Sequence, residues 1–197
     1  MVHLSRRSGF TLIEVLVVVL IVGILASFAW PSYQRFVERM RMADVLTLFG
    51  TERAAQERYI LSKHHYTKNW AFLDAVPVEV HSPINTDGSG NGYLSADGTV
   101  FYTRGGADLP DNERKPGFAV KFQEFDDRQW FIVAERVGSS WGGYQYTLVR
   151  SFDDTRAFCI PELTHPDSVL MCTDFMGVET ADELPPDPRP APYSASL

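Results

Sequence analysis

Hydrophobic residues form one continuous stretch near the start of the chain. From Phe10 to Trp30 the sequence reads FTLIEVLVVVLIVGILASFAW, and after Glu14 only Gly23 and Ser27 are not clearly apolar. As a helix this stretch is about 31 Å long, enough to cross the hydrocarbon core of a bilayer. The residues before it include basic side chains and no acid: His3, Arg6 and Arg7. The positive-inside rule therefore predicts a single span with a cytoplasmic N-terminus, and the rest of the chain on the other side of the membrane.

A second pattern, with apolar residues three and four positions apart, follows the stretch. It comprises Phe36, Met40, Ala43, Leu46, Gly50 and Ala54. This spacing is typical of one face of an amphipathic helix, and we expect that face to pack on a sheet while charged residues occupy most of the rest. The two patterns together predict one helix from Phe10 to about Ser62, roughly 80 Å long. A helix of that length indicates a stalk.

Two residues are expected to perturb this helix. Pro31 lacks an amide hydrogen and clashes with the preceding turn, which predicts a kink near Ser27 to Pro31. Gly23 weakens a helix by about 1 kcal/mol relative to alanine. Bending or local melting between Gly23 and Pro31 is one interpretation, and ordinary tolerance of Gly and Pro in a membrane helix is the other.

The second half of the chain has the character of a β-sheet domain. After an irregular region with prolines and the run NTDGSGNG, four segments are rich in aromatic and β-branched residues: 99–103, 118–125, 129–137 and 144–150. We expect three or four antiparallel strands on the apolar stripe of the helix, which is an α+β fold. Because residues 181–197 include five prolines, we expect an extended or disordered tail there.

The acid in the apolar stretch needs an explanation. A carboxylate in a membrane span costs roughly 3 kcal/mol on insertion scales, so Glu14 indicates a function with a partner. A small residue at a possible cleavage site, Gly9 before Phe10, lies ahead of the apolar stretch, whereas a secretory signal has its site behind it. Cleavage there would free an amine four residues from Glu14, or within reach of Glu14 in a neighbouring copy. Snorkelling of Glu14 toward headgroups is the alternative.

These residues resemble a known family. Gly9, the run Phe10 to Glu14, and the apolar stretch with Gly23 and Pro31 are similar to the prepilin signature of type IV pilins and type II secretion pseudopilins. The resemblance implies a type IV pilin fold, cleavage after Gly9 by a prepilin peptidase, and N-methylation of Phe10. It also implies that Glu14 neutralises the terminal amine of an adjacent subunit during filament assembly, and that the helix flexes between Gly23 and Pro31, as many assembled pili melt this stretch.

The resemblance extends to about Lys68. The Gln56 to Tyr59 segment and the pair Tyr66 and Thr67 are similar to minor pilins of the type IV pilus, although Gly50 departs from their alanine-rich helix. It implies as partners other pilin subunits, contacted through the N-terminal helices, the pilus assembly platform, and the inner membrane before export into an extracellular pilus. A type II secretion pseudopilin, a DNA-binding minor pilin and a plain single-span membrane protein are the alternatives.

The only two cysteines, Cys159 and Cys172, are an even pair in a region predicted to lie outside the cytoplasm, so we expect a disulfide. In the resembled family a C-terminal disulfide favours a pilin over a secretion pseudopilin. The predicted organisation is then a leader (1–9), an apolar helix (10–30), its amphipathic half (31–63), a helix-to-sheet loop (64–98), the sheet (99–158), a disulfide-bounded loop region (159–180) and the tail (181–197).

One loop resembles the start of a calcium site. Asp87, Ser89, Asn91 and Asp97 supply oxygen ligands, and Gly92 occupies the sixth position of an EF-hand-like loop. The terminal glutamate is absent, because Gly98 stands at that position. A flexible turn explains the glycines without a metal. Calcium is the one cofactor that the sequence offers.

Charge and motifs argue against other classes of function. The net charge of −7 disfavours nucleic acid as the main partner, and a DNA-binding pilin would have only scattered basic residues to use. These are Lys121, Arg128, Arg136, Arg150 and Arg156. The chain has no phosphate-binding loop, nucleophile elbow or His-rich metal spacing, so we expect a structural protein and not an enzyme.

Overall fold

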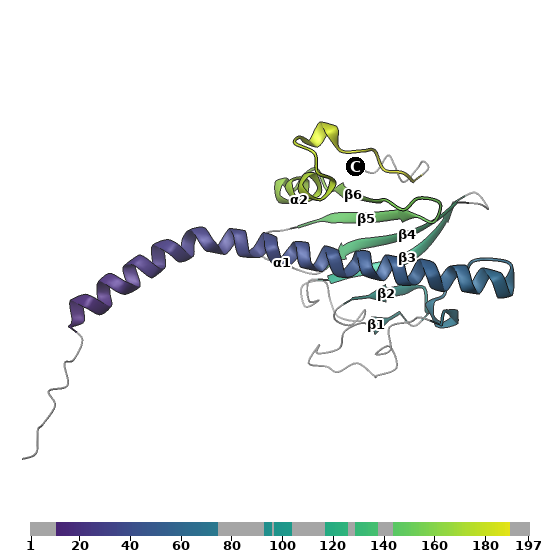
Figure 1. Cartoon of the computed structure of the whole chain (residues 1–197), viewed down its shortest axis with the longest axis horizontal. Helices are drawn as coiled ribbons and strands as arrows, with labels where there is room; N and C mark the ends of the chain where they lie inside the picture. Colours follow the sequence, from purple (N-terminus) through teal and green to yellow (C-terminus); the bar gives the residue numbers. More distant parts are fainter. Residues whose placement is uncertain are drawn as a thin grey trace, which may run out of the picture. The chain divides into compact units, whose positions relative to one another are not determined.

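The computed structural model describes residues 11–74, 93–95, 97–103, 117–125, 129–137 and 144–189. The chain divides into two compact units, Met1–Glu38 and Arg39–Leu197, and each is considered by itself. Figure 1 shows the elements of the larger unit, in which one helix lies along a sheet.

Helix α1 runs from Leu12 to Lys63 without interruption and so confirms the single long helix. It is helical throughout the stretch from Gly23 to Pro31, where local melting was one interpretation. Within this stretch the Ser27 hydroxyl donates to the carbonyl of Ile24 at 2.7 Å. Neighbouring turns and Ser side chains commonly sustain a membrane helix around a proline. The single chain therefore keeps its helix here, and flexure in a filament stays a prediction.

The buried face of α1 in the larger unit is not the predicted one. Met42, Val45, Phe49, Glu52 and Gln56 are buried at spacings of three and four. The predicted stripe lies on other sides of the helix: Phe36, Met40, Ala43 and Gly50 are exposed, and Leu46 and Ala54 are half-buried. The stripe was wrong because two of the buried positions, Glu52 and Gln56, carry polar side chains that a hydrophobic pattern assigns to solvent.

The strands form one antiparallel sheet in sequence order, β1 to β6 (Figure 1). Their bounds are Tyr93–Leu94 (β1), Val100–Tyr102 (β2), Gly117–Phe125 (β3), Gln129–Val137 (β4), Tyr146–Ser151 (β5) and Ala157–Pro161 (β6). The four predicted strands correspond to β2 to β5. Two short edge strands, β1 and β6, are present in addition to the three or four strands that were predicted. The first has only two residues, and the second ends at a proline, so neither has the length of alternating pattern that identifies a strand.

The core of the larger unit lies between α1 and one face of the sheet. Phe49 of α1 joins Phe118, Phe122, Ile132 and Leu148 of the sheet in one buried apolar cluster. Trp70, in the short 3-10 helix η1 (Trp70–Phe72), is fully buried in the same cluster, with its ring centroid 4.6 Å from that of Phe122. The opposite face has a smaller buried cluster, Phe131, Val133, Val149 and Ile160. Alternation along the strands thus buries both faces.

The region after β6 is more ordered than predicted. Helix α2 (Pro166–Met176) lies within the segment expected to be a disulfide-bounded loop, and Gly177 ends it in the left-handed conformation at φ 70°. A 3-10 helix, η3 (Ala181–Glu183), starts the segment expected to be an extended tail. Asp187 and Arg189 follow as an ion pair whose side chains are only 1% and 10% exposed. Residues 190–197 of that tail lie outside the described residues.

Candidate functional site

The N-terminus of α1 is closed by two side chains three residues apart. The Thr11 amide donates to Oε2 of Glu14 at 3.0 Å, the Thr11 hydroxyl donates to the same oxygen at 2.9 Å, and the Glu14 amide donates to the Thr11 hydroxyl at 3.3 Å. This reciprocal pattern is a capping box, which satisfies amides that have no partner in the first helical turn. Glu14 therefore has an intrachain partner in the single chain, which the Thr-x-x-Glu spacing could have revealed from the sequence.

The two residues of the predicted cleavage site, Gly9 and Phe10, lie outside the described residues. Every residue from Leu12 to Trp30 is exposed, including large side chains such as Leu16 and Phe28. By length and composition α1 is apolar enough to cross a membrane, and the apolar part is near the N-terminus. Large exposed apolar surfaces mark sites that another apolar environment covers.

A second exposed surface lies on the part of α1 that belongs to the larger unit. We call it the outer face, and it consists of Met40, Ala43, Thr47 and Gly50. Met40 is 52% exposed, and a methyl group built on Gly50 would meet no atom within 4 Å. The Thr47 hydroxyl is turned back to the carbonyl of Ala43 at 3.1 Å, so it offers little polarity to a neighbour. Small residues on one side of a helix allow another helix to approach closely.

The disulfide joins the last strand to the helix after it. Cys159 of β6 and Cys172 of α2 are bonded, with their Cα atoms 5.2 Å apart, so the predicted pairing is confirmed. Both residues are almost completely buried. On the outer side of α2, Asp174 accepts a charge-assisted hydrogen bond from Arg39 of α1. The bridge and this ion pair together attach α2 to the rest of the unit.

The calcium prediction falls largely on residues that the structure does not describe. Asp87, Ser89 and Asn91 lie outside the described residues, as does Gly92. The carboxylate of Asp97 accepts hydrogen bonds from the Ser95 hydroxyl at 2.6 Å, the Thr99 amide at 3.1 Å and the Thr99 hydroxyl at 2.8 Å. These bonds hold the pKa of Asp97 below its usual value. Asp97 thus has local partners in a turn, and calcium binding stays a prediction.

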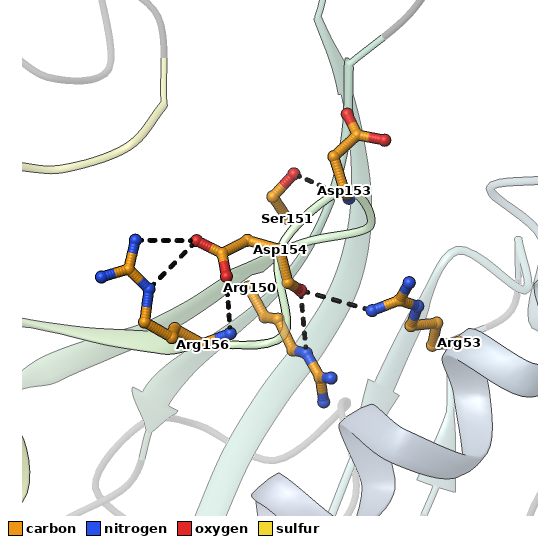
Figure 2. A network of polar contacts seen from close by, with 6 residues as sticks. All are labelled: Arg53, Arg150, Ser151, Asp153, Asp154 and Arg156. Atoms are coloured by element: carbon orange, nitrogen blue, oxygen red, sulfur yellow. Dashed lines mark hydrogen bonds and ion pairs between the residues drawn. The ribbon is translucent and has the colours of Figure 1, made fainter.

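Several basic side chains named for a DNA-binding alternative have protein partners. Lys121 pairs with Glu135 at 2.6 Å, and Arg136 donates to the carbonyls of Gly117 and Val137. Arg128 lies outside the described residues. Figure 2 shows the turn between β5 and β6, where Arg150, Arg156 and Arg53 of α1 surround Asp154. Arg156 donates to its carboxylate at 3.2 and 3.3 Å, and the other two donate to its carbonyl. The named residues do not form a free basic stripe in the described part of the chain.

The sequence pattern did not predict the burial of one acidic residue of α1. Glu52 has no exposed surface, and neither carboxylate oxygen has a hydrogen-bond partner. Burial, and to a smaller degree the negative charge of Asp74, raise the pKa of Glu52 to about 8, against a lowering by Arg58. The carboxyl is therefore mostly protonated at pH 7. Because glutamate is a charged residue type and Glu52 stands among other charged residues of the helix, the sequence pattern assigned it to the solvent-exposed side.

Comparison with known proteins adds information on the N-terminal region. Residues 4–30 match the prokaryotic N-terminal methylation motif. Fimbrial protein EcpC of Eikenella corrodens is 42% identical over 57 residues, which are 29% of this chain and 37% of that protein. Type IV major fimbrial protein FimA of Dichelobacter nodosus is 44% identical over 57 residues, which are 29% of this chain and 36% of that protein. The N-terminal region is related to type IV pilins. Type IV major pilin protein PilE1 of Neisseria gonorrhoeae is 36% identical over 65 residues, 33% of this chain and 39% of that protein.

The chain spans less than two fifths of the length of these relatives. No solved structure matches it. The long apolar helix, the antiparallel sheet and the C-terminal disulfide nevertheless fit the type IV pilin fold, so the fold that the resemblance implied is confirmed.

Proposed function

We propose that the chain is a structural subunit of a type IV pilus, more specifically a minor pilin, and not an enzyme. The observation that carries this proposal is the exposed apolar segment from Leu12 to Trp30 at the start of the same helix that joins the core of the larger unit. Such a segment is stable in a bilayer, or where other copies of the same segment surround it. A subunit stored in the inner membrane and then moved into a filament uses both environments in turn.

The maturation step follows from the motif. A prepilin peptidase cleaves between Gly9 and Phe10 and methylates the new terminal amine of Phe10. The match of residues 4–30 to the N-terminal methylation motif supports this step. The basic leader before it keeps the N-terminus in the cytoplasm, and the larger unit lies in the periplasm before assembly.

Glu14 registers each subunit against its neighbour. In the single chain its carboxylate is held by Thr11. In the filament the positively charged amine of Phe10 from an adjacent copy pairs with it, because an ion pair in an apolar environment stabilises both charges. A subunit out of register would leave the carboxylate without that charge, which is costly in the same environment.

The remaining contacts come from the rest of α1 and from the larger unit. The outer face of α1, with Met40, Ala43 and Gly50, packs between helices in the filament, with the assembly platform as partner during export. Gly23 and Pro31 allow the helix to bend or melt where packing requires it. A filament reconstruction tests this last point, because an unbroken straight helix from Gly23 to Pro31 in the filament would contradict it.

Intact-mass analysis of sheared extracellular filaments tests the proposed function. We expect the chain to begin at methylated Phe10. Recovery of the full-length chain in the membrane alone would reject the proposal. Recovery of the chain with a secretion apparatus and not in pili would identify a pseudopilin instead.

Two variants test the role of Glu14 separately. Glu14→Gln keeps the size and the hydrogen-bonding capacity of the side chain and removes its charge, so we expect normal processing but strongly reduced recovery in filaments. Glu57→Gln removes a charge from an exposed position of the same helix and is expected to behave like the wild type. Equal recovery of both variants would refute the role of the Glu14 charge.

A further inference from the structure

A pocket lined by polar and aromatic side chains lies where the chain turns back after α1. Helix α1 ends at Lys63, and the next residue, His64, has a φ of 63°, in the left-handed region. The segment that follows is fixed in the core by Trp70, whose amide donates to the Gly98 carbonyl at 2.8 Å and whose indole N–H donates to the Thr99 carbonyl at 3.2 Å. The returning segment and the sheet border a cavity of about 710 Å³, a volume typical of small-molecule sites.

Four side chains from three elements converge on this pocket. Tyr66 and Lys68 belong to the segment after α1, whereas Glu124 belongs to β3 and Trp130 to β4. Glu124 and Trp130 are directly opposite each other across the two strands, so their side chains lie on the same face of the sheet. Lys68 Nζ is 3.0 Å from Oε2 of Glu124 and 5.8 Å from the centre of the Trp130 ring. The ring centroids of Tyr66 and Trp130 are 5.4 Å apart, so an ion pair and two aromatic rings lie side by side.

The polar groups of the pocket have hydrogen-bonding capacity that the protein does not use. The Lys68 ammonium, a group with three donors, is 53% exposed and has Glu124 as its ion-pair partner. In the described part of the chain, Oε1 of Glu124, the Tyr66 hydroxyl and the Trp130 indole N–H have no hydrogen-bond partner. Trp130 is only 7% exposed, and the N–H of such an indole ordinarily has an acceptor. A ligand for this pocket would therefore both donate and accept hydrogen bonds.

We propose that this pocket binds a neutral saccharide. With histidines counted as neutral, Lys68 and Glu124 supply the only formal charges of its lining and these cancel, so no excess charge selects an ionic ligand. A sugar hydroxyl can donate to the Glu124 carboxylate and accept from the Lys68 ammonium. The C–H groups of a sugar ring form an apolar face that packs on the half-buried ring of Tyr66, which Trp130 and Phe152 hold in place. Binding requires no assembly into a filament and so does not rest on the proposed function.

Saturation-transfer NMR on the full chain tests the site, in micelles of a detergent without a sugar headgroup. The neutral probes are methyl glycosides and disaccharides of glucose, galactose, mannose and N-acetylglucosamine, and the anionic probes are glucuronate and N-acetylneuraminate. We expect at least one neutral probe to bind with a millimolar or lower dissociation constant, and both anionic probes to bind at least tenfold more weakly than that probe. No binding of any neutral probe, or tighter binding of the anionic probes, would overturn the proposal.

Substitutions on the two faces of the sheet locate the binding. Glu124→Ala removes an acceptor and Lys68→Met removes a donor, so each should raise the dissociation constant of the neutral probe at least tenfold. Glu135→Ala is the matched control, because Glu135 pairs with Lys121 at 2.6 Å on the opposite face of the same strands, and it should leave the dissociation constant unchanged. Lys68→Met keeps the proposal testable if Glu124→Ala does not fold. An unchanged dissociation constant in the pocket variants, or an equal rise in the control, would contradict binding at this pocket.

Discussion

The side chain of Gln56 offers a sharp test of how the larger unit is held together. It is fully buried, and its amide group exchanges two hydrogen bonds with the backbone of Thr67, which is itself buried. Truncation in Gln56→Ala removes both partners at once and leaves an N–H and a C=O group of Thr67 without any. Each such group costs about 1–3 kcal/mol. Because water can enter the space that the shorter side chain leaves, we expect a loss of about 3 kcal/mol in the free energy of unfolding.

Urea unfolding of the full chain in detergent micelles measures this loss, with tryptophan fluorescence as the signal. Trp70 lies three residues after Thr67 in the core, so its emission reports the state of this region. Thr51→Ala is the matched control on the same helix, because its exposed hydroxyl bonds only to carbonyls of α1. We expect the control to change the free energy of unfolding by less than about 0.5 kcal/mol.

The substitution Gln56→Glu adds a pH dependence with a defined sign. A protonated glutamic acid can donate to the Thr67 carbonyl and accept from the Thr67 amide, as glutamine does, but a carboxylate cannot donate. The folded state therefore favours the proton and raises the pKa of the new acid above about 4.3. Relative to the wild type at each pH, the variant should be nearly as stable below pH 4 and lose stability as the pH rises. A loss independent of pH, or Gln56→Ala within 0.5 kcal/mol of the wild type, would refute this account of the two hydrogen bonds.

Three other perturbations have definite expected outcomes. In Gly98→Ala, a methyl group at φ 72° would lie 2.4 Å from Oδ1 of Asn69, so we expect a loss of about 2 kcal/mol or more, seen as a lower melting temperature. Replacement of Cys159 and Cys172 by serine should lower the free energy of unfolding by about 3 kcal/mol in urea titrations, and reduction of the wild type should reproduce most of that loss. Met40→Glu, at a 52% exposed position, should leave the urea midpoint unchanged but reduce recovery in sheared filaments, and normal recovery would remove the outer face from the proposed packing.

Sequence patterns located most of the fold because its longest elements have the clearest periodicity. The central strands β3 and β4 are nine residues long and rich in aromatic and β-branched residues, and α1 begins with a long apolar stretch that only Glu14 interrupts with a charge. The two edge strands were missed because they are short. Helix α2 was missed as well, although Pro166 in its first turn and Gly177 at its end are ordinary boundary signals. Those signals were outweighed by the expectation of a loop between two bonded cysteines.

The buried face of α1 shows a more general limit of pattern reasoning. Burial of Glu52 and Gln56 depends on a proton and on the backbone of a segment eleven residues further on, and neither is visible in a hydrophobic pattern. Conversely, Met40 and Phe36 are apolar but exposed in the single chain. The proposed packing in a filament would cover them, and one helix would then carry two separate contact surfaces.

The attachment of α2 also has a consequence for the order of events during folding. Strand β6 is the last strand of the sheet, and α2 packs against it and is bonded to it through Cys159 and Cys172. An uncovered edge strand is a template for pairing with another chain. Before the thiols are oxidised, α2 is held beside β6 by its packing and by hydrogen bonds such as those of Ser168 and Asp174, without a covalent link. Formation of the bond therefore makes the cover of this edge permanent, and chains kept reduced should form more edge-to-edge aggregates than oxidised chains.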